Sequence, residues 1–226
     1  MKNKSYIGIS FIILIFGIIF IPRIITRLKD GTVTQNDRMS AGNGTNISKT
    51  LVTIGQVPQF ELTDQNNNKI TDKDYLGKVY VVEFFFSTCP SICPVMNRNM
   101  IAIQKEFASN KNFGIASITI NPDTDTPEVL KKHAIGIGAV NPNWHFLTGD
   151  KQYTLDLASK GFNLYAAKND KINGGFQHSG FFALVDKNGK ITSRKDKFNN
   201  PLIYYNGLDK NDIDKLKEDI KILLDE

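Results

Sequence analysis

The chain alternates short apolar runs with helical stripes from about residue 50 onward. Val79–Phe86 and Phe113–Ile120 are continuous β-branched and aromatic runs, typical of strands buried on both faces of a sheet. Between them, residues 94–109 carry apolar side chains at helical spacing. Thr-Pro-Glu at 126–128 supplies the N-cap and first-turn residues of another helix. A final amphipathic helix is predicted over residues 209–224.

Shorter elements fill the rest of this region. Residues 59–64, a polar NNNK turn and the ITDKDYLGK that follows predict an edge hairpin leading into the core. WHFLTG predicts a third short strand, and YTLDLASKG predicts a helix that ends at Gly161. FFALVDKNGKI predicts a hairpin. Strand–helix alternation with a terminal hairpin and a last helix predicts a three-layer α/β domain over residues 50–226.

The N-terminus carries a different pattern. Residues 6–22 are uncharged and are flanked by basic residues on both sides. As a helix this run would rise about 24 Å, which is less than the roughly 30 Å thickness of a bilayer core. If Arg23 snorkels toward the headgroups, the helix can continue through Ile24 and Ile25 and nearly reach that thickness. Because no small-x-small cleavage site follows, we predict an uncleaved transmembrane helix within residues 1–29 rather than a signal peptide. The basic residues on both sides leave its orientation open.

The basic excess belongs to this N-terminal part. Residues 1–49 hold seven basic and two acidic residues, so they account for the whole net charge of +5, and the remainder holds 21 of each. The folded domain therefore has no basic footprint of the kind that nucleic-acid binding requires. Residues 30–49 are polar and rich in Gly, Asn, Ser and Thr, which predicts a flexible tether.

The only two cysteines, Cys89 and Cys93, lie in FFFSTCPSICPVMN, where the first core strand gives way to its helix. Pro94 suits the first helical turn, which places Cys93 at or beside the N-cap and Cys89 in the preceding loop. The positive end of the helix dipole lowers thiol pKa values and favours thiolates. Binding and catalytic sites of open α/β sheets also tend to lie at the carboxyl ends of the strands.

Four interpretations of this pair compete. A structural disulfide would close so small a loop that it gains little. A thiol-disulfide oxidoreductase is plausible, although its usual spacing is Cys-x-x-Cys. A metal site needs further ligands. A thioredoxin-fold peroxidase ranks last, with Thr88 and Arg98 as weak candidates for its helper residues.

The histidines are the candidates for a further ligand. His133 lies near a predicted helix end and His145 inside a predicted strand, so both are expected to be structural. His178 lies in the Gly-rich INGGFQHSGFF, a loop that faces the cysteine turn in a thioredoxin-like arrangement. Two thiolates and one imidazole form a soft set that suits Cu(I) and can hold Cu(II). Zinc is the rival, but no clear fourth ligand is present.

Taken together, these motifs resemble the SCO/SenC family of copper-binding proteins. The features are Cys-Pro-Ser-Ile-Cys-Pro after an aromatic strand, SITINPDTDTPEVLKKHA, HSGFFALVDKNGKI, and one N-terminal anchor with a tether. The resemblance covers about residues 50–226. It implies a thioredoxin-like domain facing the extracytoplasmic side of the cell membrane, the periplasm. It also implies a copper site made by Cys89, Cys93 and His178.

The family resemblance also implies a function. Relatives help to assemble the dinuclear copper centre of cytochrome c oxidase, by delivering copper to the copper-accepting subunit or by reducing that subunit's cysteines. Both roles use the same sulfurs, which must be reduced to bind Cu(I).

The chain departs from its relatives at Asn121, where they often have an acidic residue. The nearby Asp123 and Asp125 are expected to serve turn and helix-cap roles rather than to bind metal.

Overall fold

The computed structural model describes residues 14–18, 21–22, 51–169 and 176–226. The chain divides into two units, Met1–Thr45 and Asn46–Glu226. In the first unit, residues 14–18 and 21–22 are helical. No helix within the described residues is long and apolar enough to cross a bilayer. Most of the predicted anchor and all of the predicted tether lie outside the described residues, so both remain predictions.

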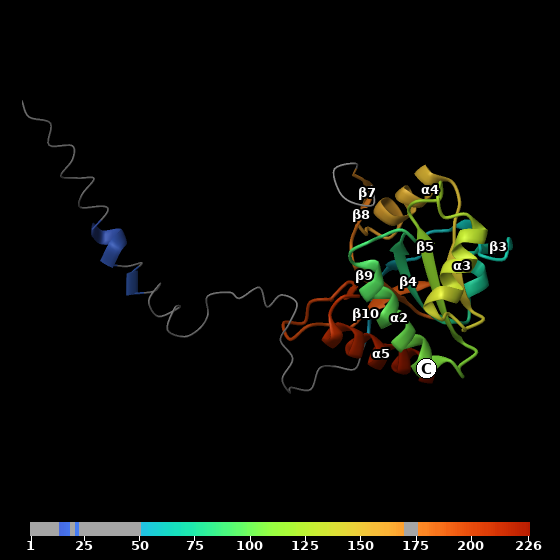
Figure 1. Ribbon diagram of the computed structural model, residues 1–226. Helices are drawn as coiled ribbons and strands as arrows, with labels where there is room; N and C mark the ends of the chain where they lie inside the picture. Colours follow the sequence, from blue (N-terminus) through green and yellow to red (C-terminus); the bar gives the residue numbers. More distant parts are fainter. Residues whose placement is uncertain (1–13, 19–20, 23–50, 170–175) are drawn as a thin grey trace, which may run out of the picture. The chain divides into compact units, whose positions relative to one another are not determined.

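The second unit is built around a seven-stranded sheet (Figure 1). Its main path has the order β1-β10-β9-β4-β5-β6, and β11 pairs with β9. The strands β4, β5 and β6 are parallel, and the other pairings are antiparallel. The bounds are β1 Val52–Gln56, β4 Val79–Phe85, β5 Phe113–Thr119, β6 Trp144–Leu147, β9 Phe181–Val185, β10 Lys190–Ser193 and β11 Tyr205–Asn206.

The two central strands are the ones predicted from continuous apolar runs. Every residue of β4 and β5 is buried, and they pair in parallel from Val79 with Phe113 to Phe85 with Thr119. Because both faces of these strands are buried, a ligand can approach them only at their ends. The carboxyl end of β4 lies immediately before the cysteine loop.

Helices and turns cover both faces of this sheet. Phe85 stacks on His133 of α3 on one face, whereas Tyr80 stacks on Tyr75 and Phe84 contacts Phe162 on the other. The predicted three-layer arrangement is therefore confirmed. The helical elements are α2 Cys93–Phe107, α3 Pro127–Ile137, α4 Lys151–Asp156, a π-helical turn Leu157–Gly161, α5 Lys210–Asp225 and a 3₁₀ turn Asp72–Tyr75.

Thr126 acts as the N-cap that the sequence predicted, and Gly138 and Asp209 supply further caps. The Thr126 hydroxyl accepts a hydrogen bond from Val129 N at the start of α3 (3.4 Å), and Gly138 ends that helix at φ 84°. The carboxylate of Asp209 caps α5 by accepting from Asp212 N (3.0 Å).

Two small sheets flank the main one. β2 Glu61–Thr63 and β3 Lys69–Thr71 form the predicted hairpin, but as a separate sheet, which a bridge from Thr63 to Thr148 joins to the chain just after β6. β7 Ala166–Lys168 and β8 Phe176–His178 form a second pair that the sequence did not predict, because three-residue strands carry too few positions to show a period.

Candidate metal centre

The cysteine loop joins β4 to α2. Cys93 is the first residue of α2 and Pro94 follows it, as the sequence predicted. Cys89 lies in the preceding turn, where its backbone N–H donates to the carbonyl of Phe86 (3.2 Å). Both are free thiols and both are buried, with exposed fractions of 8% and 3%.

His178 reaches this loop from β8, whose backbone pairs with Ala166 of β7. Its Nε2 lies 3.3 Å from Sγ of Cys93, and its Nδ1 lies 3.1 Å from the carbonyl oxygen of Ser179. A carbonyl oxygen can only accept, so Nδ1 donates its hydrogen to Ser179, and Nε2 is the ring nitrogen that faces the sulfur of Cys93. The ring also packs edge-on against Phe86 at 5.7 Å.

The result is a compact donor set. One ligand atom from each of Cys89, Cys93 and His178 lies within 4.8 Å of the other two, and all three residues are buried. These atoms come from two segments far apart in sequence, so only the folded domain assembles the set. Two sulfurs and one imidazole nitrogen at this spacing can surround one soft cation.

The two thiols differ in their electrostatics. Interaction with the Cys93 side chain is the main cause that lowers the pKa of Cys89 to about 3, and interaction with His178 lowers it further. The pKa of Cys93 is raised, first by this same interaction with Cys89 and then by burial. Cys89 is therefore the thiolate and Cys93 the proton donor.

Glu83 of β4 has a buried carboxyl group. Burial raises the pKa of Glu83 to about 7, although its Oε1 accepts a hydrogen bond from Ser117 (2.6 Å). Its Oε2 has no hydrogen-bond partner among the described residues. The negative charge of Glu83 also contributes to the raised pKa of Cys93.

Asp125 holds the cysteine loop in place, a role that the sequence did not reveal. This fully buried carboxylate accepts hydrogen bonds from the backbone N–H of Ser87 (3.0 Å) and from the hydroxyls of Ser87 and Thr119. The expected helix-cap role belongs to Thr126 instead. Only the three-dimensional contact across the strand ends shows this function.

The other predicted residues lie outside the donor set. His145 contacts Asp64 through Nδ1 (3.3 Å), and His133 stacks on Phe85, so both make structural contacts. Asn121 is buried and Asp123 pairs with Lys151. The glycines before Phe176 lie outside the described residues.

Comparisons with known proteins identify the family of this chain. The SCO1/SenC family model matches residues 52–210. An SCO2-like protein of Rickettsia typhi is 38% identical over 149 residues, which cover 64% of this chain and 71% of that protein.

Two solved structures share the fold. BsSco, described with a disulfide switch as a member of the Sco family of cytochrome c oxidase assembly proteins, gives a TM-score of 0.64 at 27% identity, covering 80% of this chain and 98% of its own. Yeast Sco1 with copper bound gives 0.56 at 26% identity, covering 74% and 89%. With the family model spanning most of its length, the chain belongs to the SCO1/SenC family.

Proposed function

We propose that this protein is a copper chaperone that binds copper through Cys89, Cys93 and His178 and assists assembly of the dinuclear copper centre of cytochrome c oxidase. The observation that carries the proposal is the meeting of two sulfurs and an imidazole nitrogen within 4.8 Å. The copper-bound yeast relative and the oxidase-assembly role of the Sco family support it.

The donor chemistry favours copper over zinc. Thiolates select Cu(I), and a three-ligand set suits its low coordination number. A structural zinc site takes four protein ligands, and the described residues bring no fourth His, Cys, Asp or Glu to this group. A bound cation would displace the proton of Cys93, so copper loading is expected to release a proton.

A second role, reduction of the recipient's cysteines, has its own support in the proximity of a thiolate and a thiol. The Cys89 thiolate attacks one sulfur of the recipient's disulfide, and the other sulfur leaves as a thiolate. Cys93 then passes its proton to that thiolate and attacks Cys89, which releases the recipient with one thiol and one thiolate and leaves a Cys89–Cys93 disulfide. Two electrons pass from this chain to the recipient. The disulfide switch described for BsSco supports such a cycle.

For the location we propose a single-pass cell-membrane protein whose copper-binding domain, residues 50–226, faces the extracytoplasmic side. Its support is the apolar run at residues 6–22 and the polar stretch at residues 30–49. A tether of this composition would let the domain reach a partner in the same membrane.

Replacing the imidazole tests the copper role. His178→Ala should weaken Cu(I) binding on the order of 100-fold or more, since a lost ligand costs at least as much as a lost outer-sphere partner. Competition with a chromogenic chelator measures the affinity. His145→Ala is the control, because it removes a histidine that lies outside the donor set, and it should bind Cu(I) as the wild type does. Equal affinity in His178→Ala and wild type would reject the site, and disulfide reduction that persists in His178→Ala would favour the reductase role.

A further inference from the structure

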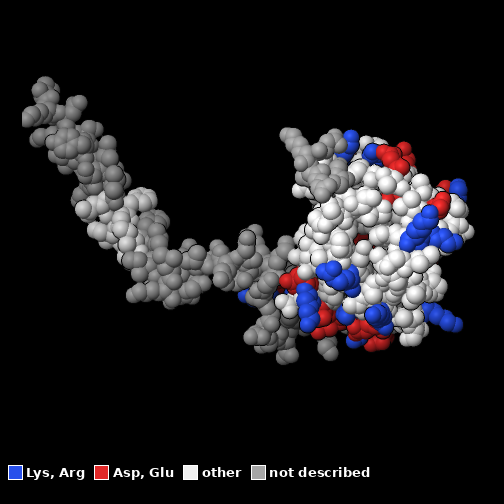
Figure 2. Space-filling view, viewed as in Figure 1, with Lys and Arg blue, Asp and Glu red and all other residues white. Residues whose placement is uncertain are grey.

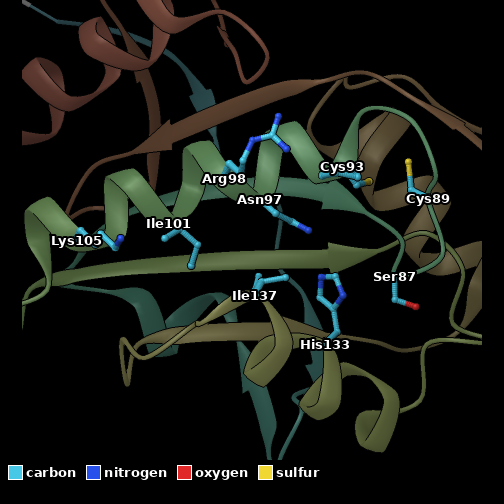
Figure 3. A pocket seen from close by; sticks show the side chains of 10 residues that line it. Ser87, Cys89, Cys93, Asn97, Arg98, Ile101, Lys105, His133 and Ile137 are labelled. Atoms are coloured by element: carbon cyan, nitrogen blue, oxygen red, sulfur yellow. The ribbon is translucent and has the colours of Figure 1, made fainter.

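A groove leads to the two cysteines. A cavity of about 590 Å³ lies between α2 and α3, and Cys89 and Cys93 form part of its wall. In Figure 3, Asn97 and Ile101 extend from α2 toward α3, His133 extends from α3 toward α2, and the cysteines stand at one end. We call this cavity the α2–α3 groove; its wall includes Asn97, Arg98, Ile101, Lys105, His133 and Ile137.

The groove combines apolar and basic side chains. Ile101 and Ile137 are partly exposed within it, whereas Arg98 and Lys105 are exposed on its α2 side. Neither cation forms an ion pair with any residue that the structure describes, although Lys217 and Lys221 on the neighbouring α5 share Glu106. Figure 2 shows a largely uncharged area in the middle of this face, with Lys and Arg side chains beside it.

Access to the sulfurs explains why a partner would enter here. Cys89 and Cys93 are nearly buried, yet both line the groove, whereas His178 does not. A protein that takes copper from these sulfurs, or exchanges a disulfide with them, must bring its own sulfur within bonding distance. The segment that carries this sulfur will therefore occupy the cysteine end of the groove.

We propose that the α2–α3 groove docks an acidic, partly apolar segment of the copper-receiving protein, with carboxylates on Arg98 and Lys105 and an apolar side chain on Ile101 and Ile137. This inference rests on the proposed function and names the surface through which it acts. Arg98 and Lys105, which have no ion-pair partner among the described residues, lie beside the apolar side chains of the groove, and this arrangement is complementary to carboxylates beside an apolar side chain.

The spacing of the cations sets the length of this segment. Arg98 and Lys105 are seven positions apart on α2, which places them about 10 Å apart along the helix axis. An extended chain rises about 3.3 Å per residue, so three or four residues span the two cations. The recipient segment should carry two acidic residues at about this separation, next to its copper-binding cysteines.

Charge reversal on the groove tests the proposal. The probe is the purified copper-receiving subunit of the same organism's cytochrome c oxidase, titrated against the full-length chain in detergent. Arg98→Glu with Lys105→Glu should weaken binding about tenfold or more, and the wild-type affinity should fall with added salt. Lys73→Glu with Lys190→Glu is the matched control, because these exposed lysines lie outside the groove and the net charge changes equally. This control should bind within about twofold of wild type.

The outcomes separate the groove from the function. If the wild-type chain does not bind the subunit or pass copper to it, the proposed function fails. If it binds, and both double variants bind equally well, the groove is wrong although the function stands. A photo-crosslinking residue at position 105 gives an independent result. An adduct with the subunit supports the proposal, and an adduct with a second copy of this chain overturns it. Cu(I) stoichiometry checks that each variant is folded.

Discussion

At the residue scale, the two chemically identical thiols of the site have opposite acidities. The interaction between the two side chains lowers the pKa of Cys89 and raises that of Cys93, and Cys93 is also the more deeply buried of the two. A lowered pKa means that Cys89 stays charged at any pH above about 3, whereas the raised pKa of Cys93 keeps it protonated through neutral pH. The sequence indicated thiolate character for both sulfurs from the helix dipole, but their inequality depends on the side-chain contact.

This asymmetry is measurable by thiolate absorbance near 240 nm. The reduced protein should show one thiolate per chain at neutral pH, which is lost only as the pH falls toward about 3. Cys93→Ala removes the neighbouring thiol that is the main cause of the low value, so the pKa of Cys89 should rise. Cys89→Ala should show no thiolate at pH 7, because Cys93 remains buried. A wild-type protein without thiolate absorbance at pH 7 would contradict the assignment.

At the element scale, the cysteine loop depends on the loop between β5 and α3. Asp125 of that loop supplies three acceptor contacts, to the Ser87 backbone, the Ser87 hydroxyl and the Thr119 hydroxyl. Removing the acceptor would leave buried donors unpaired and would release the loop that carries the sulfurs.

Asp125→Ala should therefore lower the free energy of unfolding by roughly 2–4 kcal/mol and also weaken Cu(I) binding. Asp123→Ala is the matched control from the same loop, because Asp123 is 65% exposed and makes a surface ion pair with Lys151. Its cost should stay below about 1 kcal/mol. Urea unfolding and chelator competition measure the two effects. Equal losses in both variants would show that the buried contacts do not hold the loop.

The elements also show how far the sequence could predict the fold. Long apolar runs and capping residues identified β4, β5, α3 and α5 because each signal is local. The sequence did not predict β1, because its pairing partner β10 lies far along the chain. It did not predict β7 and β8 either, because each strand has only three residues. The donor set was predicted partly from the family resemblance. Spacing alone could not bring β8 to the cysteine loop.

At the scale of the whole molecule, everything that forms the site belongs to the second unit, Asn46–Glu226. A fragment of residues 46–226 should fold alone and bind one Cu(I) with the affinity of the full-length chain. Circular dichroism and copper titration of both proteins measure this. A fragment that unfolds, or that binds Cu(I) more than about tenfold less tightly, would show that the N-terminal unit contributes to the domain.

Because Cys93 and His178 lie 85 residues apart in sequence, copper binding depends on the folded state of the domain. A disordered chain keeps both sulfurs four positions apart but loses the ring nitrogen, so it holds the ion less tightly. For each factor of ten by which the folded chain binds the ion more tightly than the unfolded chain, the free energy of unfolding rises by about 1.4 kcal/mol at saturating copper. Loss of the ion removes this protection, so the copper-free protein is the form most exposed to proteases.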